Sequence, residues 1–177
     1  MCTFTYFLLD ATLFVEEYYK AANANRSTLA TFYVPVKDTG TDKAVPSIIF
    51  NGHEVESGNA LQDIFMRQTP RSHADVEAID CHILNPNYQH PDQVADTRKS
   101  KTLMSLLIVV GGIYRASNER GAKDEEFHDT IILVPNPEPA PPRGHRKPGW
   151  KEYLIESQTF RLVAGDLAEE PAAKMAI

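Results

Sequence analysis

The chain has little cysteine: only Cys2 and Cys81 among its 177 residues. Two thiols at this separation are too few for a disulfide framework and suit no metal site, so we expect both to be reduced, as in nuclear or cytosolic proteins. The six histidines are scattered, and none lies at a metal-ligand spacing from a cysteine or another histidine. The sequence therefore predicts no metal centre and no cofactor.

Long apolar runs and an excess of basic charge are also missing. No stretch reaches the roughly 20 apolar residues of a membrane-spanning helix, and residues 1–9 lack the positive start and cleavage site of a signal peptide. The net charge of −6 argues against a dedicated nucleic-acid-binding domain, whose footprint is usually basic. Gly111-Gly112 lies inside an apolar run, so it is not a phosphate loop between a strand and a helix.

The length suits one well-buried domain, which we assign to residues 1–166, followed by a flexible C-terminal tail over residues 167–177. Apolar residues at helical spacing predict a helix over 7–22 and a short second helix over 27–33. Asn51-Gly52 between apolar runs predicts a tight hairpin. A third helix should follow from Gly58, where Asn59 and Gln62 have the spacing of a capping box.

The second half of the chain predicts four long antiparallel strands, near residues 74–84, 103–114, 127–134 and 153–163. Helices grouped against one face of such a sheet give the α+β class. The strand over 103–114 contains the unbroken apolar run Leu106 to Val110, so both of its faces are apolar. In a sheet that is covered on one side only, apolar and polar residues would alternate along each strand. This mismatch predicts that a partner protein covers the second face.

Several short strings, in this order along nearly the whole chain, resemble the nuclear transport factor 2-like family. They are Phe14-Val15 with Tyr18-Tyr19, Leu29 with Phe32-Tyr33, Asn51-Gly52 followed by Gly58, Ile79-Asp80-Cys81, Val110-Gly111, Phe127-His128, Trp150-Lys151 and Phe160-Arg161. The resemblance implies a cone: a curved antiparallel sheet with three helices on its concave face.

Within that family, the strings from Asn51 to Cys81 are most similar to the small subunits of mRNA export receptors, and the long loops at 37–46, 85–101 and 135–149 look more like the fungal ones. This resemblance implies a non-enzymatic subunit whose sheet pairs with the similar domain of a larger export receptor subunit. The heterodimer would carry mRNA, and ribosomal subunits, past Phe-Gly nucleoporins. It would shuttle between nucleus, nuclear pore and cytoplasm, without contacting a membrane.

The face that meets the partner follows from the period of two along a strand. We assign Phe127 to the cone interior because its ring is large enough to fill it, so the alternate residues of that strand point outward. A bulge at Gly111-Gly112 would reverse the parity beyond it. The predicted partner interface consists of Leu106, Ile108, Val110, His128, Thr130, Ile132, Thr159 and Arg161.

Two loops are basic and are candidate RNA contacts. Their cations are Arg98, Lys99, Lys101, Arg143, Arg146, Lys147 and Lys151. Such residues would bind phosphates through a salt-sensitive, sequence-independent attraction, made by the complex as a whole. The alternative interpretation is that they are solvated loop residues that offset the negative charge of the chain.

Two other functions stay open on sequence alone. The same cone hosts small-molecule enzymes such as ketosteroid isomerases and scytalone dehydratase. Asp80 and His82 share a strand face and would be the acid/base pair, with Tyr18, Tyr19 and Tyr33 as further cavity candidates. A polar pair without a catalytic role is the competing interpretation. The other function is a homodimeric nuclear import carrier of a small GTPase.

Overall fold

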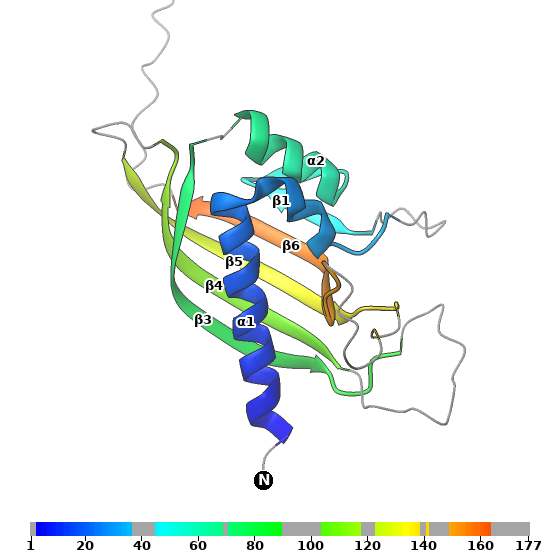
Figure 1. Ribbon diagram of the computed structural model, residues 1–177. Helices are drawn as coiled ribbons and strands as arrows, with labels where there is room; N and C mark the ends of the chain where they lie inside the picture. The colour runs from blue at the N-terminus through cyan, green and yellow to red at the C-terminus, as the bar shows by residue number, and fades with distance from the viewer. Residues whose placement is uncertain are drawn as a thin grey trace, which may run out of the picture.

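The computed structural model describes residues 3–36, 45–68, 71–89, 104–117, 123–138, 141 and 149–163. In this part of the chain, one curved sheet lies behind a long helix that crosses it diagonally (Figure 1). Shorter helical segments close one end of the concave side (Figure 1). The arrangement is the predicted α+β cone, and the predicted order of helices and strands is confirmed.

The long helix α1 spans Thr3–Ala24 and begins before the predicted start. Its buried side lies along Ala11, Val15, Tyr18 and Ala22, at the spacing of one helical face. Near its end, the Asn23 side chain donates to Ala74 O at 2.8 Å and accepts from Ala74 N at 2.9 Å. This amide therefore fixes the end of α1 to the edge of the sheet.

The second helical segment, η1 (Arg26–Phe32), is a 3₁₀-helix that buries Leu29 and Phe32 as predicted. Asn25 holds the cap position without a side-chain bond to the helix, and the Ser27 hydroxyl donates back to Asn25 Oδ1. Short 3₁₀ turns of this kind commonly connect longer elements.

The predicted hairpin is confirmed: β1 (Ser47–Phe50) pairs with β2 (His53–Val55). Asn51 and Gly52 both have positive φ, 49° and 83°, as the tight turn requires. The Asn51 side chain also accepts a hydrogen bond from Leu162 N at 2.9 Å.

The third helix consists of α2 (Gly58–Asp63) and a π-helical turn, η2 (Ile64–Gln68). Its cap is Ser57, which accepts from Ala60 N at 3.2 Å, so the capping box predicted at Asn59 and Gln62 is wrong. Gln62 instead accepts from Ala30 N at 3.1 Å and joins α2 to η1.

The sheet has the order β2-β1-β6-β5-β4-β3. The four predicted long strands are β3 (His73–Asn85), β4 (Ser105–Arg115), β5 (Asp124–Pro135) and β6 (Tyr153–Val163), and each is antiparallel to the next of the four. β1 pairs in parallel with β6. Tyr33 makes one further parallel bridge to the same strand at Ile155, and Ser47 rejoins it two positions farther on, at Ser157.

The predicted face of β4 is wrong. Leu106, Ile108 and Val110 are each 0% exposed and belong to the core beneath α1. The register with β5 is the reason: Gly112 lies opposite Phe127, so the even-numbered residues of β4 share the inner face with that ring. The predicted bulge is not at Gly111-Gly112, where this register is regular; it lies in β3, between Val76 and Ala78.

Candidate partner interface and the polar cluster inside the cone

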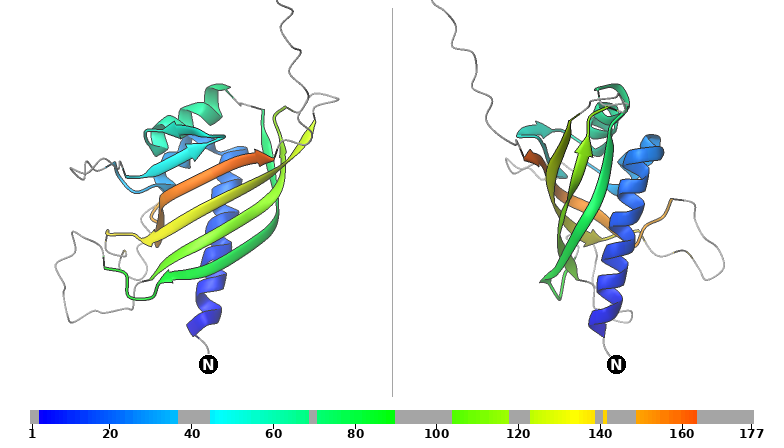
Figure 2. Two further views of the ribbon diagram at one scale, coloured as in Figure 1. Left: turned by 180° about the vertical axis from the view of Figure 1, so that it is seen from behind. Right: turned by 90° about the vertical axis from the view of Figure 1, so that its left-hand side faces the viewer.

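The convex side of the sheet carries three rows of residues that run across β4, β5 and β6. We call these nine residues the outer face. The rows are Leu107, Ile132 and Ser157; Val109, Thr130 and Thr159; and Gly111, His128 and Arg161. Among the described elements, no helix lies over this side of the sheet (Figure 2).

The outer face is apolar at one end and polar at the other. Leu107, Val109 and Ile132 lie in adjacent rows, and Val109 is 36% exposed. His128 and Arg161 are register partners at the far end, both exposed. An apolar centre with a polar rim is the usual composition of a protein interface. Burying each aliphatic side chain would contribute about 1.5–3 kcal/mol before the costs of association.

The predicted interface residues divide into two groups. His128, Thr130, Ile132, Thr159 and Arg161 lie on the outer face, as their strand parity predicted. Leu106, Ile108 and Val110 lie inside, and the residues that take their places on the convex side are Leu107 and Val109. The contact of this face with a partner stays a prediction.

The chain itself covers one end of the convex side. After a register shift between Ile132 and Leu133, Val134 and Leu154 point away from the main core and form a second small core with Val34. Val45 and Tyr88 pack against it. The chain's own residues therefore occupy this end of the convex side. The predicted tail over 167–177 lies outside the described residues.

Asp80 and His82 do not form a catalytic pair inside the cone. They lie opposite Val109 and Leu107, so they border the outer face on the convex side. Their side chains are 80% and 63% exposed, and the distance between His82 Nε2 and Asp80 Oδ2 is 4.0 Å. They are separated by the sheet from the buried tyrosines, so their positions agree with the interpretation as an exposed polar pair.

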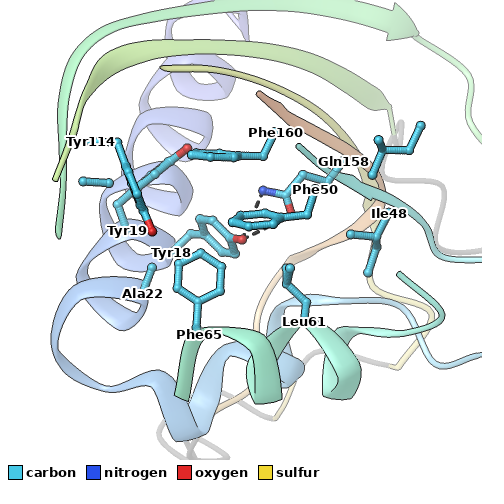
Figure 3. Close-up of a pocket in the computed structure, with 12 residues that line it drawn as sticks. Tyr18, Tyr19, Ala22, Ile48, Phe50, Leu61, Phe65, Tyr114, Gln158 and Phe160 are labelled. Carbon is cyan, nitrogen blue, oxygen red and sulfur yellow. Dashed lines mark hydrogen bonds between the residues drawn. The ribbon is translucent and has the colours of Figure 1, made fainter. Parts of the chain in front are cut away.

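The interior instead holds a polar cluster that the sequence analysis missed. The hydroxyls of Tyr18 and Tyr33 lie 2.8 Å apart, and both donate to the Gln158 side-chain carbonyl. Figure 3 shows Tyr18 beside Gln158. Asp129 Oδ2 accepts from Gln158 Nε2 at 2.6 Å and from the Tyr19 hydroxyl at 2.8 Å. The cluster links α1, the end of η1, β5 and β6.

Burial dominates the electrostatics of this cluster. It raises the pKa of Asp129 to about 6, although the hydrogen bonds from Gln158 and Tyr19 partly oppose the shift. Burial also raises the pKa values of Tyr18, Tyr19 and Tyr33 far above their ordinary range, so these hydroxyls stay neutral. Asp129 Oδ1 has no hydrogen-bond partner among the residues that the structure describes.

A small cavity lies beside the cluster, at the end of the cone closed by α2 and η2. Its walls include Tyr18, Tyr114, Gln158, Phe65 and Phe160 (Figure 3). Its volume of about 10 Å³ is close to the minimum that one water molecule needs. Substrate pockets are typically hundreds of Å³ in volume, so this cavity is much smaller than a typical substrate pocket.

Of the seven basic loop residues, only Lys151 lies in the described part of the chain. Its Nζ lies 3.9 Å from the centre of the Phe32 ring, and burial lowers its pKa. It is therefore half-buried against η1 rather than presented on a loop, which weakens its assignment to RNA. The described residues contain no helix long and apolar enough to cross a bilayer, and no group of metal-ligating side chains.

No protein-family profile and no curated protein matches the sequence. Solved structures do match. A chain of "Sac3N peptide bound to Mex67:Mtr2" is 25% identical with a TM-score of 0.69, over 88% of this chain and 98% of that one. A chain of the Chaetomium thermophilum Mex67 NTF2-like domain complexed with Mtr2 is 24% identical, also with a TM-score of 0.69, over 88% and 97%. The chain of "Structure of Mtr2" is 22% identical with a TM-score of 0.65, over 88% of this chain and 98% of that one.

The likeness extends over nearly the full length of each matched chain, so it concerns the whole domain rather than one motif. It agrees with the curved sheet, the three helical segments and their order. The chain therefore has the nuclear transport factor 2-like fold, and its structure is similar to those of Mtr2 and of the Mex67:Mtr2 complexes.

Proposed function

We propose that this chain is the non-enzymatic small subunit of a heterodimeric mRNA export receptor. The observation that carries the proposal is the outer face, an uncovered part of a sheet with aliphatic residues toward one end, on a fold similar to Mtr2. The partner would be the nuclear transport factor 2-like domain of a larger, Mex67-type subunit, which would cover the outer face.

The finer parts of the function follow from the same assignment. The heterodimer would carry mRNA, and ribosomal subunits, past Phe-Gly nucleoporins, and would shuttle between nucleus and cytoplasm. The cations at Arg98, Lys99, Lys101, Arg143, Arg146 and Lys147 would add a sequence-independent attraction to RNA. The small cavity supports a binding role over an enzymatic one, because it is much smaller than a typical substrate pocket.

The test is the native mass of the full chain, measured by light scattering during size-exclusion chromatography. The chain is measured alone and after co-expression with the nuclear transport factor 2-like domain of a Mex67-type subunit from its own organism. A one-to-one complex that survives gel filtration is expected. A stable homodimer that ignores the larger subunit would contradict the proposal and favour the import carrier or the enzyme.

A matched pair of variants locates the contact. Thr130→Arg replaces the central residue of the outer face with a large cation, and Leu13→Arg makes a similar change on the solvent side of α1, where Leu13 is 48% exposed. We expect the first variant to abolish the complex and the second to leave it intact. Equal effects of the two variants would remove the assignment of the outer face to the partner.

A further inference from the structure

Asp129 is a buried acid without a buried base. Its side chain is completely buried, and the residues bonded to it are Tyr19 and Gln158, both neutral. Tyr18 and Tyr19 face it from α1 and Tyr33 from the end of η1, whereas its register neighbours on β4 and β6 are Val110 and Phe160. Among the described residues, no lysine, arginine or histidine pairs with this carboxylate.

The two oxygens of Asp129 differ. Oδ2 accepts both hydrogen bonds, while Oδ1 is buried and accepts none. A proton can therefore bind to Oδ1 and leave both existing bonds in place. The neutral acid would have one O–H without an acceptor, which costs less free energy than an unpaired buried charge.

We infer that Asp129 is a proton-binding site at the centre of the fold, and that binding one proton stabilises the folded domain. The site is in a position to do this because its carboxyl group on β5 bonds directly to Tyr19 of α1 and to Gln158 of β6. The inference is independent of the partner and of the proposed function, because Asp129 lies inside the cone.

The direction of the pH effect follows from the raised pKa. The folded state holds the proton up to about pH 6, whereas an aspartate in the unfolded chain releases it near pH 4. The stabilisation is complete below about pH 4 and is lost as the pH rises through 6. Two powers of ten in proton affinity correspond to about a hundredfold change in the unfolding equilibrium constant.

The experiment measures urea unfolding of the full chain between pH 4 and pH 7 for wild type, Asp129→Asn and Asp80→Asn. The asparagine keeps an oxygen for Tyr19 and Gln158, and Asp80 is the exposed control. We expect the unfolding constant of wild type, relative to Asp129→Asn, to rise about a hundredfold from pH 4 to pH 7. The unfolding constant of wild type relative to Asp80→Asn should change by no more than a few-fold over the same pH range. A flat ratio for Asp129→Asn would overturn the inference.

A second measurement does not depend on a variant that folds. Carbon-13 NMR of the aspartate side-chain carboxyl groups in the folded wild-type chain reports each titration directly. We expect the Asp129 carboxyl signal to titrate near pH 6. If the Asp129 carboxyl group titrates below pH 5, it does not bind a proton as inferred.

Discussion

Ile108 and Val109 are consecutive in β4 and face opposite sides of the sheet: Ile108 is 0% exposed, and Val109 is 36% exposed. Ile108 lies opposite Ile131 in the core, and Val109 lies opposite Thr130 in the middle row of the outer face. The boundary between the core and the candidate interface therefore passes between two adjacent aliphatic residues.

Glutamate substitutions at these two positions should have different consequences. Ile108→Glu buries an unpaired charge and should destabilise the domain by more than about 4 kcal/mol, enough to prevent folding. Val109→Glu should change the stability of the lone chain by less than about 1 kcal/mol and abolish the complex with the larger subunit. Circular dichroism and co-purification measure the two effects; a Val109→Glu chain that still binds its partner would contradict the proposed interface.

The neighbouring glycines of β4 provide a second paired test. A Cβ on Gly112 would lie 2.0 Å from the carbonyl oxygen of Asp75, at the bulge in β3, whereas a Cβ on Gly111 would meet nothing closer than 3.8 Å. Gly112→Ala should therefore force β3 and β4 apart and cost about 3 kcal/mol.

Gly111→Ala, on the outer face, should change the free energy of unfolding by less than about 1 kcal/mol. Urea unfolding of the two alanine variants measures the difference. Equal losses of stability would mean that β3 is not this close to Gly112.

Arg26 connects three elements near the closed end of the cone. Its guanidinium donates to Ala22 O at 2.7 Å, Phe65 O at 2.9 Å and Ser72 O at 2.5 Å. Arg26→Met removes the donors for these carbonyls and should cost about 2–4 kcal/mol.

The control for this variant is Arg67→Met. The Arg67 side chain is 78% exposed and forms an ion pair with Asp63 at 3.4 Å. Loss of this exposed pair should lower the free energy of unfolding by less than about 0.5 kcal/mol. Thermal unfolding of both variants is the measurement, and a similar small effect of each would show that Arg26 does not stabilise this end.

Much of the fold was predictable because its signals are local. Asn51-Gly52 predicts the hairpin, and the four strands are long apolar segments bounded by polar ones. The face of β4 was not predictable, because an apolar run fits either parity and only the register with β5 decides between them.

The interior cluster could have been found from parity. Asp129 alternates with Phe127 and Ile131, and Gln158 alternates with Phe160, so each shares the inward face already assigned to those rings. A polar residue between inward-facing aromatic and aliphatic residues is the signal. The pairing of the two was not predictable, because it depends on α1 bringing Tyr18 and Tyr19 over the sheet.

The basic loops give a prediction about cargo. Changing Arg98, Lys99, Lys101, Arg143, Arg146 and Lys147 to glutamate should weaken RNA binding by the assembled complex and flatten its dependence on salt. Lys151→Met serves as the contrast, because this lysine covers the Phe32 ring and should affect stability more than RNA binding. Filter binding across a range of salt concentrations is the measurement. Unchanged affinity and salt slope in the sixfold variant would favour solvated loops without a role in RNA binding.

Tyr33 and Ser47 occupy almost adjacent places along the same edge of β6, although 13 residues, 34–46, separate them in the chain. A single residue would close that gap in a continuous strand. β6 therefore aligns two segments that are separate in the sequence, and one edge of this strand holds the end of η1 and the start of the hairpin in line with each other.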